Sequence, residues 1–134
     1  MSPRISAATA PNPVSDPAPD RAAALSTADA QLAPIRRELE RQRLFRLEQL
    51  DELAADTAEA VALGDDGRQQ VTRVLALTAE AALTETTAAL RRLEDGSYGT
   101  CEHCGEPIPV ARLEVLPTSR LCTPCQSRAE SRRR

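Results

Sequence analysis

All four cysteines of this 134-residue sequence lie after position 100, in two pairs with the same internal spacing. Cys101 and Cys104 form the first pair and Cys122 and Cys125 the second, which gives the pattern C-x2-C-x17-C-x2-C. Two residues between cysteines allow one tight turn to direct both sulfur atoms at the same ion. The spacing therefore predicts one Zn²⁺ bound by four thiolates, with no position left for water, which is a structural rather than a catalytic site.

Other uses of these thiols fit less well. A redox CxxC motif requires a strand–helix context that the sequence lacks, and two disulfides require an oxidising compartment. His103, inside the first pair, is an alternative ligand, but a solvated histidine is favoured because four thiols already complete the shell. Arg112 and Arg120 lie between the pairs, where we expect them to offset the negative charge of the thiolates.

The rest of the chain divides into a tail and a helical region. Residues 1–25 are rich in Pro, Ala, Ser and Asp, which predicts a disordered tail. The chain lacks the apolar run of about 18 residues that a membrane span needs, and its first 25 residues lack a signal-peptide stretch. We therefore expect a cytoplasmic location. The net charge of -3 argues against general nucleic-acid binding.

Residues 26–95 predict two long helices joined by a turn at 64–67. Ser26, three residues before Asp29, resembles a helix start. Pro34 fits either the first turn of a helix that starts there or a kink in one that starts near Ser26. Gly64 suits the end of the first helix, Asp66 could cap a second helix that starts near residue 68, and Gly96 ends that helix.

Each predicted helix carries one apolar stripe with three–four spacing. The first stripe comprises Leu39, Leu47, Leu50, Ala54, Thr57 and Val61, and the second comprises Leu75, Ala79, Ala82, Thr86, Ala89 and Leu93. Two such stripes can be buried only against each other, which predicts an antiparallel coiled-coil hairpin. The predicted fold class is mainly α, with residues 96–134 forming a four-cysteine zinc finger and a short basic C-terminal helix or tail at the base of the hairpin.

Charge is unevenly distributed along the predicted hairpin. Residues 48–66 contain seven acids and no base, whereas residues 36–46 contain five arginines. Exposed coiled-coil faces are commonly charged, so a solvated surface explains this pattern without any function. The alternative is that an acidic tip enters a basic pore or approaches a metal-bearing active site in a partner.

The segment LEDGSYGTCEHCGEPIPVARLEVLPTSRLCTPCQ resembles the zinc-finger signature of the DksA/TraR family. The matching residues are Asp95, Gly96, Tyr98, Gly99, Cys101, Cys104, Gly105, Ile108, Arg112, Leu113, Glu114, Pro117, Thr118, Cys122 and Cys125. A weaker similarity covers DAQLAPIRRELE, which resembles the family's lead-in to its coiled coil. The order and approximate lengths of the segments also agree.

The resemblance implies a bacterial transcription factor that binds RNA polymerase and not DNA. Family members insert their hairpin into the secondary channel of the polymerase, and several act with the alarmone ppGpp. The resemblance makes Asp65 and Asp66 the candidate tip residues. The family's frequent Asp-x-x-Asp-x-Ala tip motif is not preserved here, because the two acids are adjacent. Asp56 and Glu59 have the family's spacing but lie on the first arm.

The altered tip keeps a second hypothesis open. The chain could be a zinc-stabilised interaction or dimerisation module, or a competitor that occupies the channel without activity driven by the tip. We do not expect an enzyme, because no nucleophile–base pair is visible, the single His has no evident partner, and the predicted metal shell is closed.

Overall fold

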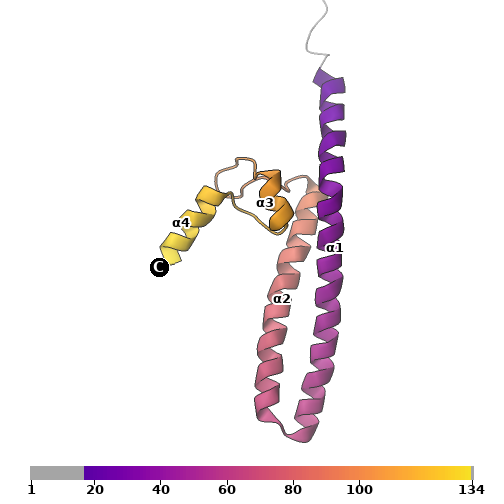
Figure 1. The fold of residues 1–134 in the computed structure, drawn as a ribbon, viewed down its shortest axis with the longest axis vertical. Coiled ribbons are helices and arrows are strands. Elements are labelled where there is room, and N and C mark those ends of the chain that lie inside the picture. Colours follow the sequence, from indigo (N-terminus) through magenta and orange to yellow (C-terminus); the bar gives the residue numbers. More distant parts are fainter. Residues whose placement is uncertain (1–16, 134) are drawn as a thin grey trace, which may run out of the picture. The chain divides into compact units, whose positions relative to one another are not determined.

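The computed structural model describes residues 17–133, with side chains from residue 30 onward, and these residues are mainly helical (Figure 1). The helices are α1 (Pro17–Leu63), α2 (Asp66–Asp95), α3 (Val110–Val115) and α4 (Thr123–Arg133). The described residues contain no strand beyond one isolated antiparallel bridge between Thr100 and Pro107. The predicted fold class is therefore confirmed. None of the helices within residues 17–133 combines the length and the apolar character needed to cross a membrane.

The chain forms two units, Met1–Pro34 and Ile35–Arg134. In the first unit, α1 begins at Pro17, well before the start predicted at Ser26. Proline is favoured in the first turn of a helix because its missing N–H has no partner there in any case. Pro34 lies inside α1 rather than at its first turn. The predicted disorder of residues 1–25 stays a prediction, and residues 1–16 lie outside the described part of the chain.

In the second unit, α1 and α2 run antiparallel and side by side as a hairpin (Figure 1). We call residues 64–68 its tip and the end near Ile35 and Asp95 its base. α1 ends at Leu63, and the φ of 69° at the following Gly64 lies in the left-handed region that glycine adopts without strain. The Asp65 carboxylate accepts a hydrogen bond from the Arg68 amide at 3.0 Å. Asp65, and not Asp66 as predicted, is therefore the cap of α2, which begins at Asp66.

The predicted stripe of α1 is correct at Leu39 and Thr57 and wrong at Ala54 and Val61. Leu39 is fully buried, as is Ala60, but Val61 is 58% exposed and Ala54 is also exposed. Small side chains allow the two helices to approach closely, so Ala60 occupies the contact line and the larger Val61 lies beside it.

The predicted stripe of α2 is correct except near the tip. Of the buried residues of α2, Ala79, Thr86 and Ala89 belong to it, whereas Thr72 is buried in place of the predicted Leu75, which is 46% exposed. The Thr57 hydroxyl lies 2.9 Å from the Thr72 hydroxyl across the contact line, and Thr72 donates to the Gln69 carbonyl at 3.1 Å. Paired hydroxyls satisfy each other, which lets a polar residue replace an apolar one at a buried position.

The four-cysteine module, residues 96–133, follows α2 after another left-handed glycine. Gly96 has φ of 85°, and the amides of Ser97 and Tyr98 donate to the Arg92 carbonyl at 3.0 and 3.1 Å. The module has its own small core around Ile108 and Leu113, which are 4% and 2% exposed. The buried Tyr98 hydroxyl donates to the Pro117 carbonyl at 2.7 Å, which joins the start of the module to the loop after α3.

Candidate metal centre and hairpin tip

The fold brings all four cysteines into one cluster. Their sulfur atoms lie within 4.8 Å of one another. Cys101 and Cys104 come from the loop after α2, whereas Cys122 precedes α4 and Cys125 lies in its first turn. Cys101, Cys122 and Cys125 are buried, and Cys104 is exposed. Two segments that α3 separates in the sequence therefore converge on a single point, as the spacing predicted.

The spacing of the sulfur atoms fits a tetrahedral metal ion. The Cys104 and Cys122 Sγ atoms are 3.7 Å apart. Four ligands at a Zn–S distance of about 2.3 Å define a tetrahedron whose edges are about 3.8 Å. A disulfide requires about 2.05 Å between its sulfur atoms, and the four cysteines are free thiols. Four soft sulfur ligands in this arrangement are the donor set that zinc prefers.

Two backbone hydrogen bonds form the loop that carries the first pair. The Gly105 amide donates to the Cys101 carbonyl at 3.0 Å, and the Cys101 amide donates to the Glu106 carbonyl at 2.8 Å. Gly105 has φ of 78°, a conformation that L side chains rarely adopt. The Glu102 amide also donates to the Arg120 carbonyl at 2.9 Å, so the loops of the two pairs are joined by their backbones.

The thiols ionise unequally in the absence of a cation. Backbone amides of Cys104, Cys122 and His103 donate to the Cys101 sulfur and lower the pKa of Cys101 to about 6. The neighbouring Cys122 thiol and burial raise the pKa of Cys125 to about 12. Negative charge on one sulfur opposes ionisation of the next, and a divalent cation removes that opposition. A bound divalent cation would therefore lower the pKa of Cys125.

Neighbouring residues differ in part from the sequence-based expectation. His103 is exposed and lies outside the cluster of sulfur atoms. Arg112 donates to the Ser119 hydroxyl at 3.2 Å, and Arg120 pairs with Glu102 at 4.0 Å. These two arginines thus have partners other than the sulfur atoms, because the loop geometry places a serine and a carboxylate within reach.

The tip contains one ion-pair cluster that the sequence analysis did not identify. The Arg68 guanidinium contacts Asp56, and it pairs with Glu59 at 2.7 Å. These hydrogen bonds raise the pKa of Arg68 above its ordinary value. Arg68 is the first base after the acidic stretch, and an antiparallel hairpin brings it back beside the end of α1. That position was the sequence signal that could have predicted the contact.

The two candidate tip residues have different roles in the fold. Asp65 is exposed and caps α2 through its carboxylate. Asp66 is also exposed, and its carboxylate oxygen lies 3.5 Å from the Gln69 side-chain nitrogen, near the limit for a hydrogen bond. The Asp66 carboxylate is therefore the less engaged of the two.

Comparison with known proteins shows where this architecture occurs. Residues 96–131, which include all four cysteines, match the prokaryotic dksA/traR C4-type zinc finger family. A relative from Caulobacter vibrioides, the RNA polymerase-binding transcription factor DksA, is 38% identical over 91 residues, which cover 65% of this chain and 64% of that relative. The solved structure of transcription factor DksA2 from Pseudomonas aeruginosa superposes with a TM-score of 0.70 and 28% identity, covering 78% of this chain and 87% of that one.

The chain resembles proteins of the DksA/TraR family in its zinc-finger segment and in its fold.

The chain also matches shorter stretches of other relatives. The RNA polymerase-binding transcription factor DksA of Haemophilus influenzae is 44% identical over 45 residues, which cover 34% of this chain and 31% of that relative. The chain thus spans less than two thirds of the length of the curated relatives that it matches. The family resemblance inferred from the cysteine signature is confirmed.

Proposed function

We propose that this protein binds bacterial RNA polymerase and regulates transcription, as the names of its Caulobacter and Haemophilus relatives describe for those proteins. Support comes from 38% identity over 91 residues, from the match of residues 96–131 to the zinc-finger family and from a fold that superposes on transcription factor DksA2 with a TM-score of 0.70. A regulator of this kind acts by contact, which agrees with a molecule that presents a long helical hairpin instead of a catalytic cleft. We accordingly propose a cytoplasmic protein without catalytic activity.

We further propose that Cys101, Cys104, Cys122 and Cys125 hold one structural Zn²⁺. The observation that carries this proposal is the convergence of the four sulfur atoms, with 3.7 Å between Cys104 and Cys122. When bound, zinc supplies a cross-link between the first loop of the module and the start of α4. Four protein ligands leave no position for water, so the centre supports the fold and performs no hydrolysis.

The proposed mode of binding is entry of the hairpin into the secondary channel of the polymerase. The arm from Ile35 to Leu63 is about 44 Å long at about 1.5 Å per residue, and its distal half carries most of the seven acids of residues 48–66. Asp65 and Asp66 are the proposed tip residues. Because Asp65 caps α2, we assign direct contact with the polymerase to Asp66.

A competition assay tests the binding proposal. The zinc-loaded protein should displace a labelled secondary-channel factor from bacterial RNA polymerase at micromolar concentration. Failure to bind the polymerase at that concentration, with zinc content and helicity intact, would exclude the proposal.

Promoter-specific transcription tests the role of the tip. Asp66→Asn should preserve polymerase binding and change the effect on transcription, because only the tip charge is removed. Asp51→Asn is the matched control, since Asp51 is an exposed acid on α1 away from the tip. An equal effect of both variants would show that the overall charge of the arm matters and that Asp66 has no special role. The same assay with and without ppGpp tests the alarmone dependence that the resemblance implies.

One observation favours a second candidate, a factor that occupies the channel without activity driven by the tip. Arg68 neutralises Asp56 and Glu59, so two acids of the distal arm are already paired within the chain. Such a factor would displace other channel factors, and Asp66→Asn would leave transcription unchanged. The two candidates therefore differ in the effect of one substitution.

A further inference from the structure

The four cysteines differ in how well the fold shields them. Cys101, Cys122 and Cys125 are 2%, 8% and 5% exposed. Cys104, in contrast, is exposed. The Cys101 sulfur accepts hydrogen bonds from three backbone amides, and the Cys104 sulfur accepts one from the amide of Glu106. Cys104 is therefore the proposed metal ligand that a molecule arriving from solvent meets first.

A hollow borders the cysteine cluster on the surface of the module. It has a volume of about 370 Å³, within the range of about 300–1,000 Å³ that is typical of sites for small molecules. Cys104, Cys122 and Cys125 line this cysteine hollow, and Cys101 is not part of its lining. Its other lining residues are Glu106, Pro107, Pro109, Thr123, Pro124 and Arg128. The cysteine hollow thus borders three of the four proposed ligands, and one of these three is the exposed Cys104.

The wall of the cysteine hollow is largely apolar. Three of its lining residues, Pro107, Pro109 and Pro124, have no backbone N–H with which to hold a thiolate or a ligand. One acid and one base, Glu106 and Arg128, also line it, so their charges offset each other and charge alone selects no ligand. A small thiol fits this lining, because its carbon atoms suit an apolar wall and its sulfur is a soft donor that zinc binds well.

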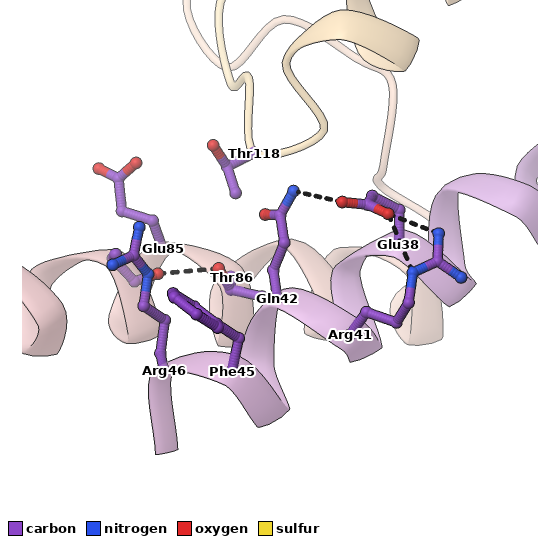
Figure 2. A pocket seen from close by; sticks show the side chains of 9 residues that line it. Glu38, Arg41, Gln42, Phe45, Arg46, Glu85, Thr86 and Thr118 are labelled. Carbon is purple, nitrogen blue, oxygen red and sulfur yellow. Dashed lines mark hydrogen bonds and ion pairs between the residues drawn. The ribbon is translucent and has the colours of Figure 1, made fainter. Parts of the chain in front are cut away.

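A hollow at the base of the hairpin differs in this respect. It has a volume of about 500 Å³ and is bounded by α1, α2 and the loop after α3 (Figure 2). Glu38 accepts hydrogen bonds from Arg41 and Gln42. Arg46 donates to the Gln49 side chain at 2.8 Å. These side chains already have partners within α1, whereas the cysteine hollow presents an exposed metal ligand.

We infer that zinc enters and leaves the module at Cys104, through the cysteine hollow, by exchange with a small thiolate. The incoming sulfur replaces that of Cys104 while the three buried cysteines keep their places, so exchange begins without unfolding of the module. One bond to sulfur is broken and one is formed, and no atom is oxidised or reduced. The inference rests on the proposed zinc centre and is independent of binding to polymerase.

The rate of zinc release from the full chain tests this exchange. The zinc content is measured first, since protein without zinc overturns the proposed centre and the exchange together. Released zinc is then followed with a chromogenic chelator, in the absence of oxygen, at rising concentrations of mercaptoethanol. The rate should increase in proportion to the thiol concentration. A rate that does not depend on the thiol, in protein that holds zinc at the start, overturns the exchange alone, because release then waits for the module to open.

Two tryptophan substitutions on α4 test the route. Thr123 lines the cysteine hollow, so Thr123→Trp should fill it and slow thiol-driven release about tenfold, because attack at sulfur depends on access. Ser131→Trp is the matched control. Ser131 is exposed on the same helix, about 12 Å further along its axis at about 1.5 Å per residue. It should change the rate less than about twofold, and equal rates for the two variants contradict the route.

Alkylation of the zinc-loaded protein identifies the cysteine that is reached first. With less than one equivalent of iodoacetamide, a cysteine sulfur forms a bond to the methylene carbon and iodide leaves. Tandem mass spectrometry should find the label chiefly on Cys104 and least on Cys101, which is 2% exposed. Thr123→Trp should reduce the labelling of Cys104. Equal labelling of all four cysteines, or labelling first at Cys101, overturns the inference.

Discussion

The hairpin and the four-cysteine module achieve stability by different means. The contact line of the hairpin consists largely of small residues, such as Ala60, Thr72 and Ala79, which bury little area but allow two long helices to pack closely. The module, residues 96–133, has only a small core around Ile108 and Leu113. A segment of about 40 residues or fewer rarely buries enough surface to fold alone. The hairpin is thus stabilised by packing of its two helices, whereas the proposed zinc would stabilise the module by a cross-link.

The largest expected effect comes from metal removal, which affects the two regions differently. Chelation or Cys101→Ser should unfold the module, because zinc binding supplies on the order of 10 kcal/mol to a site of this type. The hairpin should keep most of its helicity but melt at a lower temperature, since its base loses a support. Circular dichroism in the far ultraviolet and amide NMR spectra of residues 96–131 measure the two effects.

His103→Ala is the control for the metal experiment, because His103 is exposed between two of the cysteines. This variant should retain one equivalent of zinc. If it loses zinc as Cys101→Ser does, the ligand set includes the histidine, and the proposed four-cysteine centre is wrong.

A pair of leucine truncations should have the next largest effects. Leu39 in the hairpin is 0% exposed and Leu113 in the module is 2% exposed. Truncation of a buried leucine to alanine costs about 2–5 kcal/mol. Leu39→Ala should lower the melting temperature with or without zinc, whereas Leu113→Ala should have no further effect after chelation has unfolded the module. Equal effects of Leu113→Ala in both states would show that the module folds without metal.

A smaller effect is expected from Tyr98, whose buried hydroxyl donates to the Pro117 carbonyl. Burial raises the pKa of Tyr98 to about 12, above the value of about 10 in an unfolded chain. The fold thus favours the neutral phenol, and this stabilisation is complete below about pH 10 and is lost as the pH rises from about 10 toward 12. Tyr98→Phe should cost about 1 kcal/mol at neutral pH and remove that alkaline dependence. Since Tyr98 is the single tyrosine, its ultraviolet absorbance follows the ionisation directly.

The smallest effect is expected at Arg68, whose pairs with Asp56 and Glu59 are partly exposed. Arg68→Ala should change the melting temperature only slightly, and the change should disappear in high salt. Arg73→Ala is a suitable control, because Arg73 is an exposed arginine just over one turn further along α2. A large, salt-independent loss for Arg68→Ala would show that the cluster stabilises the turn through more than charge.

The spacing of the cysteines and the positions of two glycines predicted much of the fold and of the candidate metal centre. The cysteine spacing predicted the convergence of four sulfur atoms, and Gly64 and Gly96 marked the ends of both arms because each adopts a positive φ. The detailed contact line could not be predicted near the tip. Periodicity selects a face of the helix, but the choice between Ala60 and Val61 depends on how closely the partner helix approaches.

Contacts between distant residues also lay beyond the sequence. The hydrogen bond from Tyr98 to Pro117 depends on how the loop after α3 folds back, and it follows no repeating pattern. The choice of Asp65 over Asp66 as the cap depends on a difference of one residue in where α2 begins. Local periodicity determines neither of these features.

The hydroxyl contact between Thr57 and Thr72 has a consequence for how such a hairpin can change in length. Insertion of one residue into either arm would turn every later side chain by about 100° and separate the two threonines. An insertion that keeps the contact face of α1 against the contact face of α2 must add about seven residues to each arm, which is close to two full turns. We therefore expect the hairpins of related proteins to differ in length by steps of about 10 Å, and intermediate lengths should be rare.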